Sequence, residues 1–141
     1  MTLPEILLPL FVEVALTFTL YVWLAYYRVI LIRRGDVHPR DIALRQPNWP
    51  VPVLQIGYAA QNQLELPVLF YVLTVLAIVS HHADLAFVVL AWIFVLFRLL
   101  HAYVHVTSNR ISLRGPFFGV SLLVLIVMWV IFAVRILAGL P

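Results

Sequence analysis

Long apolar stretches separated by short polar segments are the main feature of this chain. Four of them, at about 4–32, 51–80, 84–107 and 116–138, are long enough to cross roughly 30 Å of hydrocarbon. The charged residues lie mostly at their ends. The pattern predicts an all-α membrane protein, a four-transmembrane-helix bundle in one domain that covers residues 1–141.

Composition supports this interpretation and excludes several classes of chemistry. The chain is 65% hydrophobic and only 11% charged, which is too little charge to cover a water-soluble domain of 141 residues. It has no cysteine, so disulfides, thiol catalysis and thiolate metal sites are excluded. The N-terminal stretch lacks a basic start and carries Glu5 and Glu13, so we expect it to be a retained first helix rather than a signal peptide.

The charged residues of the connections predict an orientation. All nine basic residues are arginines, and the first connection, 33–50, contains Arg33, Arg34, Arg40 and Arg45. The third contains Arg110 and Arg114, whereas the second, SHHAD, has no basic side chain apart from histidine. The positive-inside rule therefore places connections one and three in the cytoplasm and both termini outside or in the lumen of a multi-pass protein. These arginines suit an anionic lipid surface and do not indicate nucleic-acid binding.

A polar stripe lies on the second apolar stretch. It consists of four residues at spacings of 3, 4 and 3, which share one helical face: Gln55, Tyr58, Asn62 and Glu65. Pro67 follows two residues later, and an interior proline frees a carbonyl and kinks a helix. Such a bend either widens a cavity just past the stripe or serves only packing.

A second stripe with the same spacing lies on the third stretch and comprises Arg98, His101, His105 and Ser108. The short second connection makes the two helices antiparallel neighbours, and the rise per residue places Asn62 and Arg98 at matching depth. Because charge in a bilayer is costly, we expect Glu65 to pair with Arg98, with Asn62 satisfying the remaining polar atoms. The cluster is then either a structural clamp that sets helix register or the floor of a polar binding cavity open to the cytoplasm.

Two further pairings follow from the same cost of intramembrane charge. Glu13 in the first stretch and Arg135 near the end of the fourth are candidates for a structural ion pair. His101 and His105, with Glu65 opposite, form a conceivable metal site of two histidines and one carboxylate. We assign no metal, because another interpretation accounts for His101.

At these residues the chain resembles the MAPEG superfamily, the membrane-associated proteins in eicosanoid and glutathione metabolism, and in particular its small bacterial members. The family's second helix carries an Asn-x-x-Glu pair, matched by Asn62 and Glu65. Its third carries Arg-x-x-His, matched by Arg98 and His101, and Arg114 matches an arginine sixteen positions after the first. The resemblance spans all four helices and implies a homotrimer, placed in the cell inner membrane if the source is bacterial.

The resemblance also implies a function, namely a glutathione-dependent transferase or peroxidase that acts on lipophilic electrophiles. Glutathione is then the co-substrate, bound between subunits near the cytoplasmic side. Arg114 is the catalytic candidate, because a nearby cation favours the reactive thiolate. In this scheme Glu65 receives the amino group of glutathione, and Arg98 holds Glu65 in place.

Several positions depart from the family pattern. Tyr58 and Gln61 stand where family enzymes carry arginines that grip the carboxylates of glutathione, and Arg40 or Arg45 is a candidate to replace them. Three more family residues are changed, at His105, Gly115 and Phe118. The predicted glutathione-binding set comprises Tyr58, Gln61, Asn62, Glu65, Arg98, His101 and His105. The alternative function is a non-catalytic lipid-binding or scaffold trimer.

Overall fold

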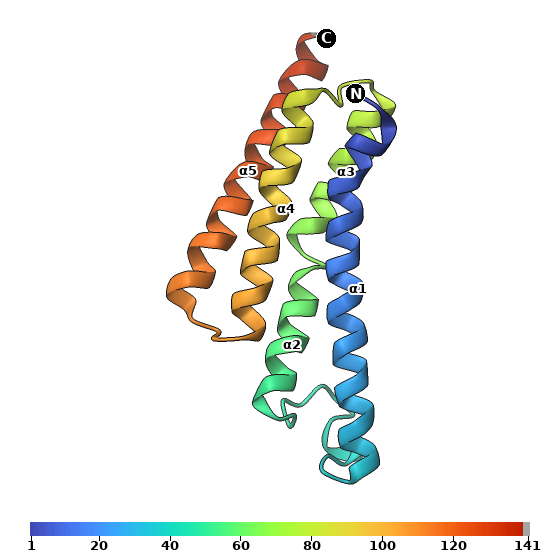
Figure 1. Ribbon diagram of the computed structural model, residues 1–141, viewed down its shortest axis with the longest axis vertical. Coiled ribbons are helices and arrows are strands. Elements are labelled where there is room, and N and C mark those ends of the chain that lie inside the picture. Colours follow the sequence, from blue (N-terminus) through green and yellow to red (C-terminus); the bar gives the residue numbers. More distant parts are fainter. Residues whose placement is uncertain (140–141) are drawn as a thin grey trace.

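Four long apolar helical spans form an elongated all-α bundle in the computed structural model, which describes residues 1–139. The helices are α1 (Leu3–Arg34), α2 (Val51–Asn62), α3 (Leu66–Val79), α4 (Leu85–Val106) and α5 (Ile111–Ala138), with a short 3-10 turn, η1 (Pro39–Asp41), in the first connection. The predicted four-span membrane bundle is confirmed in this form, with α2 and α3 together making the second span. Both ends of the chain lie at one end of the bundle, and the connection 35–50, called loop one below, lies at the other (Figure 1).

The second span is not the continuous helix that the apolar pattern predicts. It is interrupted at residues 63–65, before Pro67 and not after it. Pro67 is the second residue of α3, where its missing N–H costs nothing, whereas in a continuous helix its ring would clash with the carbonyl of Gln63. The proline therefore starts a new helix, and the break lies inside the polar stripe.

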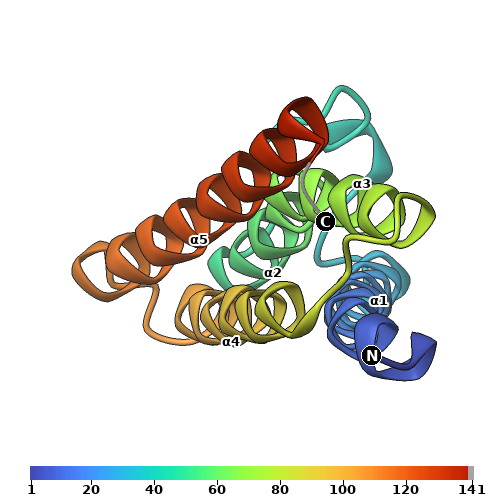
Figure 2. The same cartoon turned by 90° about the horizontal axis from the view of Figure 1, so that it is seen from above.

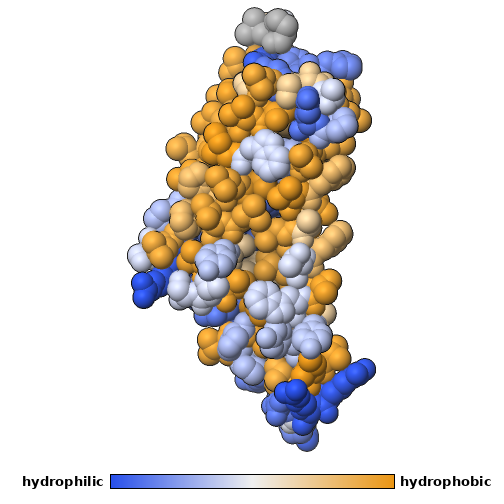
Figure 3. Space-filling view, viewed as in Figure 1, coloured by the Kyte–Doolittle hydropathy of each residue, from blue (hydrophilic) through white to orange (hydrophobic). Residues whose placement is uncertain are grey.

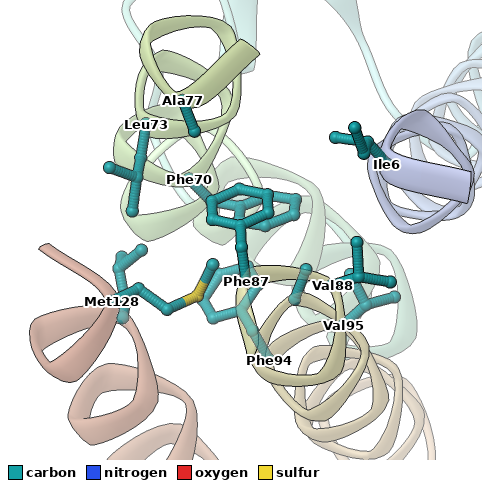
Figure 4. Close-up of a cluster of buried hydrophobic side chains, with 11 residues drawn as sticks. Ile6, Phe70, Leu73, Ala77, Phe87, Val88, Phe94, Val95 and Met128 are labelled. Carbon is teal, nitrogen blue, oxygen red and sulfur yellow. The ribbon is translucent and has the colours of Figure 1, made fainter. Parts of the chain in front are cut away.

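The core has two parts at different heights. Near the end that carries both termini, residues of α3, α4 and α5 meet around Phe70 and Phe94, whose stacked rings have centroids 4.7 Å apart (Figure 4). Nearer loop one, Leu24 of α1 packs with Val53 and Ile56 of α2. α5 runs beside α4 and crosses the rest of the bundle obliquely (Figure 2). Much of the outer surface is apolar, as expected for helices that face lipid (Figure 3).

The ion pair of Arg135 corrects one prediction. Its guanidinium Nη1 lies 2.8 Å from Oδ2 of Asp84, the residue before α4, and not near Glu13. Oδ1 of Asp84 also accepts a hydrogen bond of 2.9 Å from the backbone N–H of Phe87, so the same carboxylate caps α4 and ties it to α5. The predicted pairing of Glu13 with Arg135 is therefore wrong, because a carboxylate closer in height to Arg135 is available at the helix terminus.

We expect this tie to weaken in acid. Partial burial raises the pKa of Asp84, but the Phe87 N–H and the Arg135 guanidinium lower it further, so it lies below the ordinary value. A carboxyl group whose pKa is lower in the folded than in the unfolded state stabilises the fold at pH values above its unfolded pKa, which is about 4. This stabilisation is lost as the pH falls through the folded-state pKa. Asp84→Asn keeps a capping oxygen but removes the charge. We expect it to lower the free energy of unfolding by less than about 1 kcal/mol at pH 7, because the pair is partly exposed.

Thermal unfolding of Asp84→Asn and the parent chain between neutral pH and pH 3 measures this effect. The difference in Tm should shrink as the pH drops, since both chains then carry a neutral group at this position. A difference that stays constant over the whole range would show that the carboxylate charge contributes nothing.

Candidate functional site

Arg98 of α4 is the centre of a polar cluster in the middle of the bundle. Its side chain is fully buried, and its Nη2 donates to the backbone oxygen of Asn62 (3.1 Å), to Oδ1 of Asn62 (2.6 Å) and to Oε1 of Gln63 (3.1 Å). The predicted match in depth between Asn62 and Arg98 is thereby confirmed. The break before Pro67 explains the arrangement, because an interrupted helix leaves carbonyls free to accept from a side chain.

The counter-charge of Arg98 is Glu13 of α1, not Glu65. Arg98 Nε lies 3.7 Å from Glu13 Oε1, and both side chains have no exposed area. Glu65 is exposed, and its Oε2 accepts a hydrogen bond of 2.8 Å from Asn62 Nδ2. The predicted direct ion pair of Glu65 and Arg98 is therefore replaced by a relay, in which Asn62 accepts from Arg98 and donates to Glu65.

The relay leaves the Glu65 carboxylate available at the protein surface. Asn62 fixes only one of its oxygens, and Glu65 makes no ion pair within residues 1–139. In the interior, four polar atoms are buried without hydrogen-bond partners among the described residues: the two carboxylate oxygens of Glu13, and Nε and Nη1 of Arg98. Buried polar atoms of this kind are costly, so the cluster keeps unused capacity for hydrogen bonds to water or a polar ligand.

The two histidines of α4 form the next part of the site, toward the turn between α4 and α5. His101 and His105 are buried, with ring centroids 5.6 Å apart, and His101 lies 5.8 Å from the ring of Phe118 on α5. Nδ1 of each ring lacks a hydrogen-bond partner in the part of the chain that the structure describes. These two nitrogens therefore have hydrogen-bonding capacity that no described residue uses.

Arg114 lies in the first turn of α5 and interacts electrostatically with both histidines. Its Nη1 donates to Oδ1 of Asn109 in the preceding turn, which orients the guanidinium. Within residues 1–139, Arg114 has no acidic partner, so its charge is available to an anion. The structure thus brings Asn62, Arg98, both histidines and Arg114 along one path through the bundle.

Tyr58 and Gln61 contribute to a second site, outside the Arg98 cluster. Both line a pocket formed by α1, loop one and α2, together with Arg28 and Arg45. Arg45, a candidate to replace the missing arginines, therefore shares a pocket with Tyr58 and Gln61, but not with His101 or Arg114. Arg40 is exposed and does not line this pocket.

The structure does not assemble the metal site that the two histidines made conceivable. Across residues 1–139, no three side chains of histidine, cysteine, aspartate or glutamate gather at metal-binding distances. Glu65 accepts a hydrogen bond from Asn62, and the ring of His105 neighbours that of His101.

Two residues of the polar cluster around Arg98, namely Glu13 and Gln63, were not among the site residues predicted from the sequence.

Fold and site define a class of protein: an all-α membrane protein with four spans, in which a half-buried asparagine on the second span meets a buried arginine and two buried histidines on the third. The chain matches the model of the MAPEG family over residues 6–134, and it belongs to that family. Comparisons with curated proteins and with solved structures gave no match.

Proposed function

We propose that the chain is a glutathione-dependent membrane transferase or peroxidase that acts on lipophilic electrophiles. The observation that carries the proposal is the path from the exposed carboxylate of Glu65 through Asn62 and the two histidines to Arg114, which has no acidic partner in residues 1–139. A zwitterionic tripeptide with a cationic amino end and a thiolate fits a site with a carboxylate at one end and a guanidinium at the other. Membership of the MAPEG family supports the same co-substrate.

In this proposal each residue has one task. Glu65 binds the amino group of glutathione, and Asn62, held by Arg98, keeps the Glu65 carboxylate oriented. His101 and His105 offer hydrogen bonds to the peptide. Arg114 stabilises the thiolate, whose sulfur attacks the electrophilic atom of a substrate arriving from the bilayer. With an aryl halide a carbon–sulfur bond forms and the halide leaves with its bonding electrons; with a hydroperoxide a sulfur–oxygen bond forms, the O–O bond breaks, and the released alkoxide takes up a proton. Catalysis by this site consists of positioning and charge stabilisation.

We also propose that the active form is a homotrimer in which a neighbouring chain closes the site, with loop one and the α4–α5 turn in the cytoplasm. The open sides of the site support this assembly, since Glu65 and Gly115 are exposed in the single chain. The arginines of both connections support the orientation. A bacterial member would then lie in the inner membrane.

The alternative function, a non-catalytic lipid-binding or scaffold trimer, is favoured by one observation. Tyr58 and Gln61 replace family arginines, and both face the pocket beside α1 and not the histidines. A neutral pair at these positions weakens the grip on glutathione's carboxylates.

Glutathione binding to the purified full chain separates the two functions. We expect glutathione to raise the Tm, and Glu65→Gln to weaken binding about 10-fold or more, because a charge-assisted hydrogen bond contributes about 1.5–3 kcal/mol. Glu65 is exposed and has one hydrogen-bond partner, so the substitution should leave the fold intact. Calorimetric titration of both chains with glutathione measures the difference.

Glu5→Gln is the matched control, since it removes the same charge from an exposed residue in the first turn of α1. It should bind glutathione like the parent chain. Equal affinity of Glu65→Gln and the parent would contradict the assigned role of Glu65. No binding by an intact, folded parent chain would instead favour the non-catalytic function.

A further inference from the structure

The pocket between α1, loop one and α2 has a volume of about 560 Å³ and is separate from the Arg98 cluster. It is lined by two arginines, Arg28 and Arg45, and by the aromatic side chain of Trp49. No aspartate or glutamate lines it. Neither arginine forms an ion pair within residues 1–139, so the pocket holds two positive charges without a counter-charge.

Arg28 is held in the pocket without using up its hydrogen-bonding capacity. Its guanidinium carbon lies 4.9 Å from the ring centroid of Trp49, a cation–π contact that fixes the side chain. Its Nε is buried and has no hydrogen-bond partner among the described residues. Gly57 of α2 lies beside this guanidinium, since a Cβ built there would be in ordinary van der Waals contact with Arg28 Nη2, at 3.7 Å. A fixed guanidinium with free donors is suited to an oxyanion.

The position of the pocket identifies the kind of oxyanion. Arg28 lies six residues before the end of α1, about 9 Å along the helix axis. The surface of the bundle changes from apolar to polar toward that end (Figure 3). Leu24 and Leu54 line the pocket together with the polar groups, and Trp49 and Tyr58 are residue types that favour the membrane–water interface. A ligand that matches both parts has an anionic head and an apolar tail.

We propose that this pocket binds the phosphate headgroup of an anionic phospholipid. The guanidinium groups of Arg28 and Arg45 receive the phosphodiester, and the hydroxyl of Tyr58 and the amide of Gln61 face the rest of the headgroup. A zwitterionic lipid such as phosphatidylcholine fits less well, because the pocket has no carboxylate to balance the positive ammonium group of its headgroup. The inference uses neither Arg98, nor the histidines, nor Arg114. It assigns Tyr58, Gln61 and Arg45, which the sequence suggested for glutathione, to a lipid in a separate pocket, so it holds whether or not the Arg98 cluster acts on glutathione.

Native mass spectrometry of the full chain in detergent tests the proposal with phosphatidylglycerol, phosphatidylcholine and inorganic phosphate as separate probes. We expect phosphatidylglycerol to bind at least 10-fold more tightly than phosphatidylcholine. The double variant Arg28→Gln/Arg45→Gln should lose at least 10-fold in phosphatidylglycerol affinity. Arg33→Gln/Arg34→Gln removes the same charge from two exposed residues that do not line the pocket, and it should stay within about twofold of the parent.

Equal losses in both double variants would overturn the proposal, since they would indicate general attraction of arginines to an anionic lipid. Binding of inorganic phosphate as tight as that of phosphatidylglycerol would also overturn it, in favour of a soluble phosphate compound. If the Arg28 variant fails to fold, Arg45→Gln alone decides, because Arg45 is exposed and its side chain contributes no hydrogen bond to the described structure. That single variant should still lose affinity for phosphatidylglycerol, and an unchanged affinity would contradict the assignment.

Discussion

Arg98→Met is expected to lower the free energy of unfolding by about 3–5 kcal/mol, the cost of breaking a buried ion pair from one side. The substitution leaves the carboxylate of Glu13 buried without a counter-charge. It also removes the donor to Asn62 and Gln63, whose oxygens accept from Arg98 at the break between α2 and α3. Methionine fills much of the same volume, so the loss reports polar contacts more than packing. Denaturation of the full chain in detergent measures it.

Glu13→Gln and the double variant Glu13→Gln/Arg98→Met show whether the two residues act as a pair. Glu13→Gln leaves the Arg98 charge buried alone, so it should also destabilise the bundle strongly. The double variant buries no charge at either position and should be less destabilised than the sum of the single variants. Additive losses would mean that the 3.7 Å contact between the two side chains contributes nothing to stability.

Span lengths and the depth of the Arg98 cluster were predictable from the sequence, because both follow from regular helix geometry. The apolar stretches had to cross a fixed thickness, and the short second connection made the second and third spans antiparallel neighbours, which meet where α2 packs beside α4. Counting residues along two helices then placed Asn62 beside Arg98, and the hydrogen bonds between them confirm this. The break at residues 63–65 was missed because Asn62 and Glu65 fit the face of one continuous helix, and this spacing does not show that a new helix starts just before Pro67.

Partners of the buried charges could not be assigned in the same way. Glu13 lies on α1, which is apolar on nearly all sides, so periodicity did not indicate whether it faces Arg98 or Arg135. Asp84 lies in the second connection, outside the helices, so helical spacing gave no indication that it caps α4 and pairs with Arg135. Contacts between helices depend on their rotation about their axes, and a sequence of mostly apolar residues does not fix that rotation.

The wide polar face of α2 explains why the predicted binding set divides between two places. Gln61 precedes Asn62 by one residue, which turns it by about 100° around the helix axis. Gln61 therefore lines the pocket beside α1, while Asn62 accepts from Arg98. A sequence motif records which residues are near one another along the chain, whereas the helix decides which side of the molecule each one faces.

Arg114→Gln is expected to slow glutathione conjugation at neutral pH by about 10- to 100-fold, if the proposed thiolate role holds. An ordinary thiol has a pKa of about 8.5 and is mostly protonated at pH 7. A nearby guanidinium lowers this pKa and so raises the fraction of thiolate. Without Arg114 the bound thiol returns toward its ordinary pKa. The loss should therefore be largest near neutral pH and shrink as the pH rises above about 9, where the thiolate forms without help.

Conjugation rates of the full chain with a lipophilic aryl halide, measured from pH 6.5 to 9.5, test this dependence. Arg110→Gln is the matched control, since Arg110 precedes the same helix, is exposed and makes no ion pair in the described chain. Arg114→Lys, which keeps the charge, should recover part of the rate at neutral pH. If Arg114→Gln and Arg110→Gln follow the parent's pH profile alike, Arg114 only ties α5 to Asn109, and the thiolate is stabilised elsewhere or not at all.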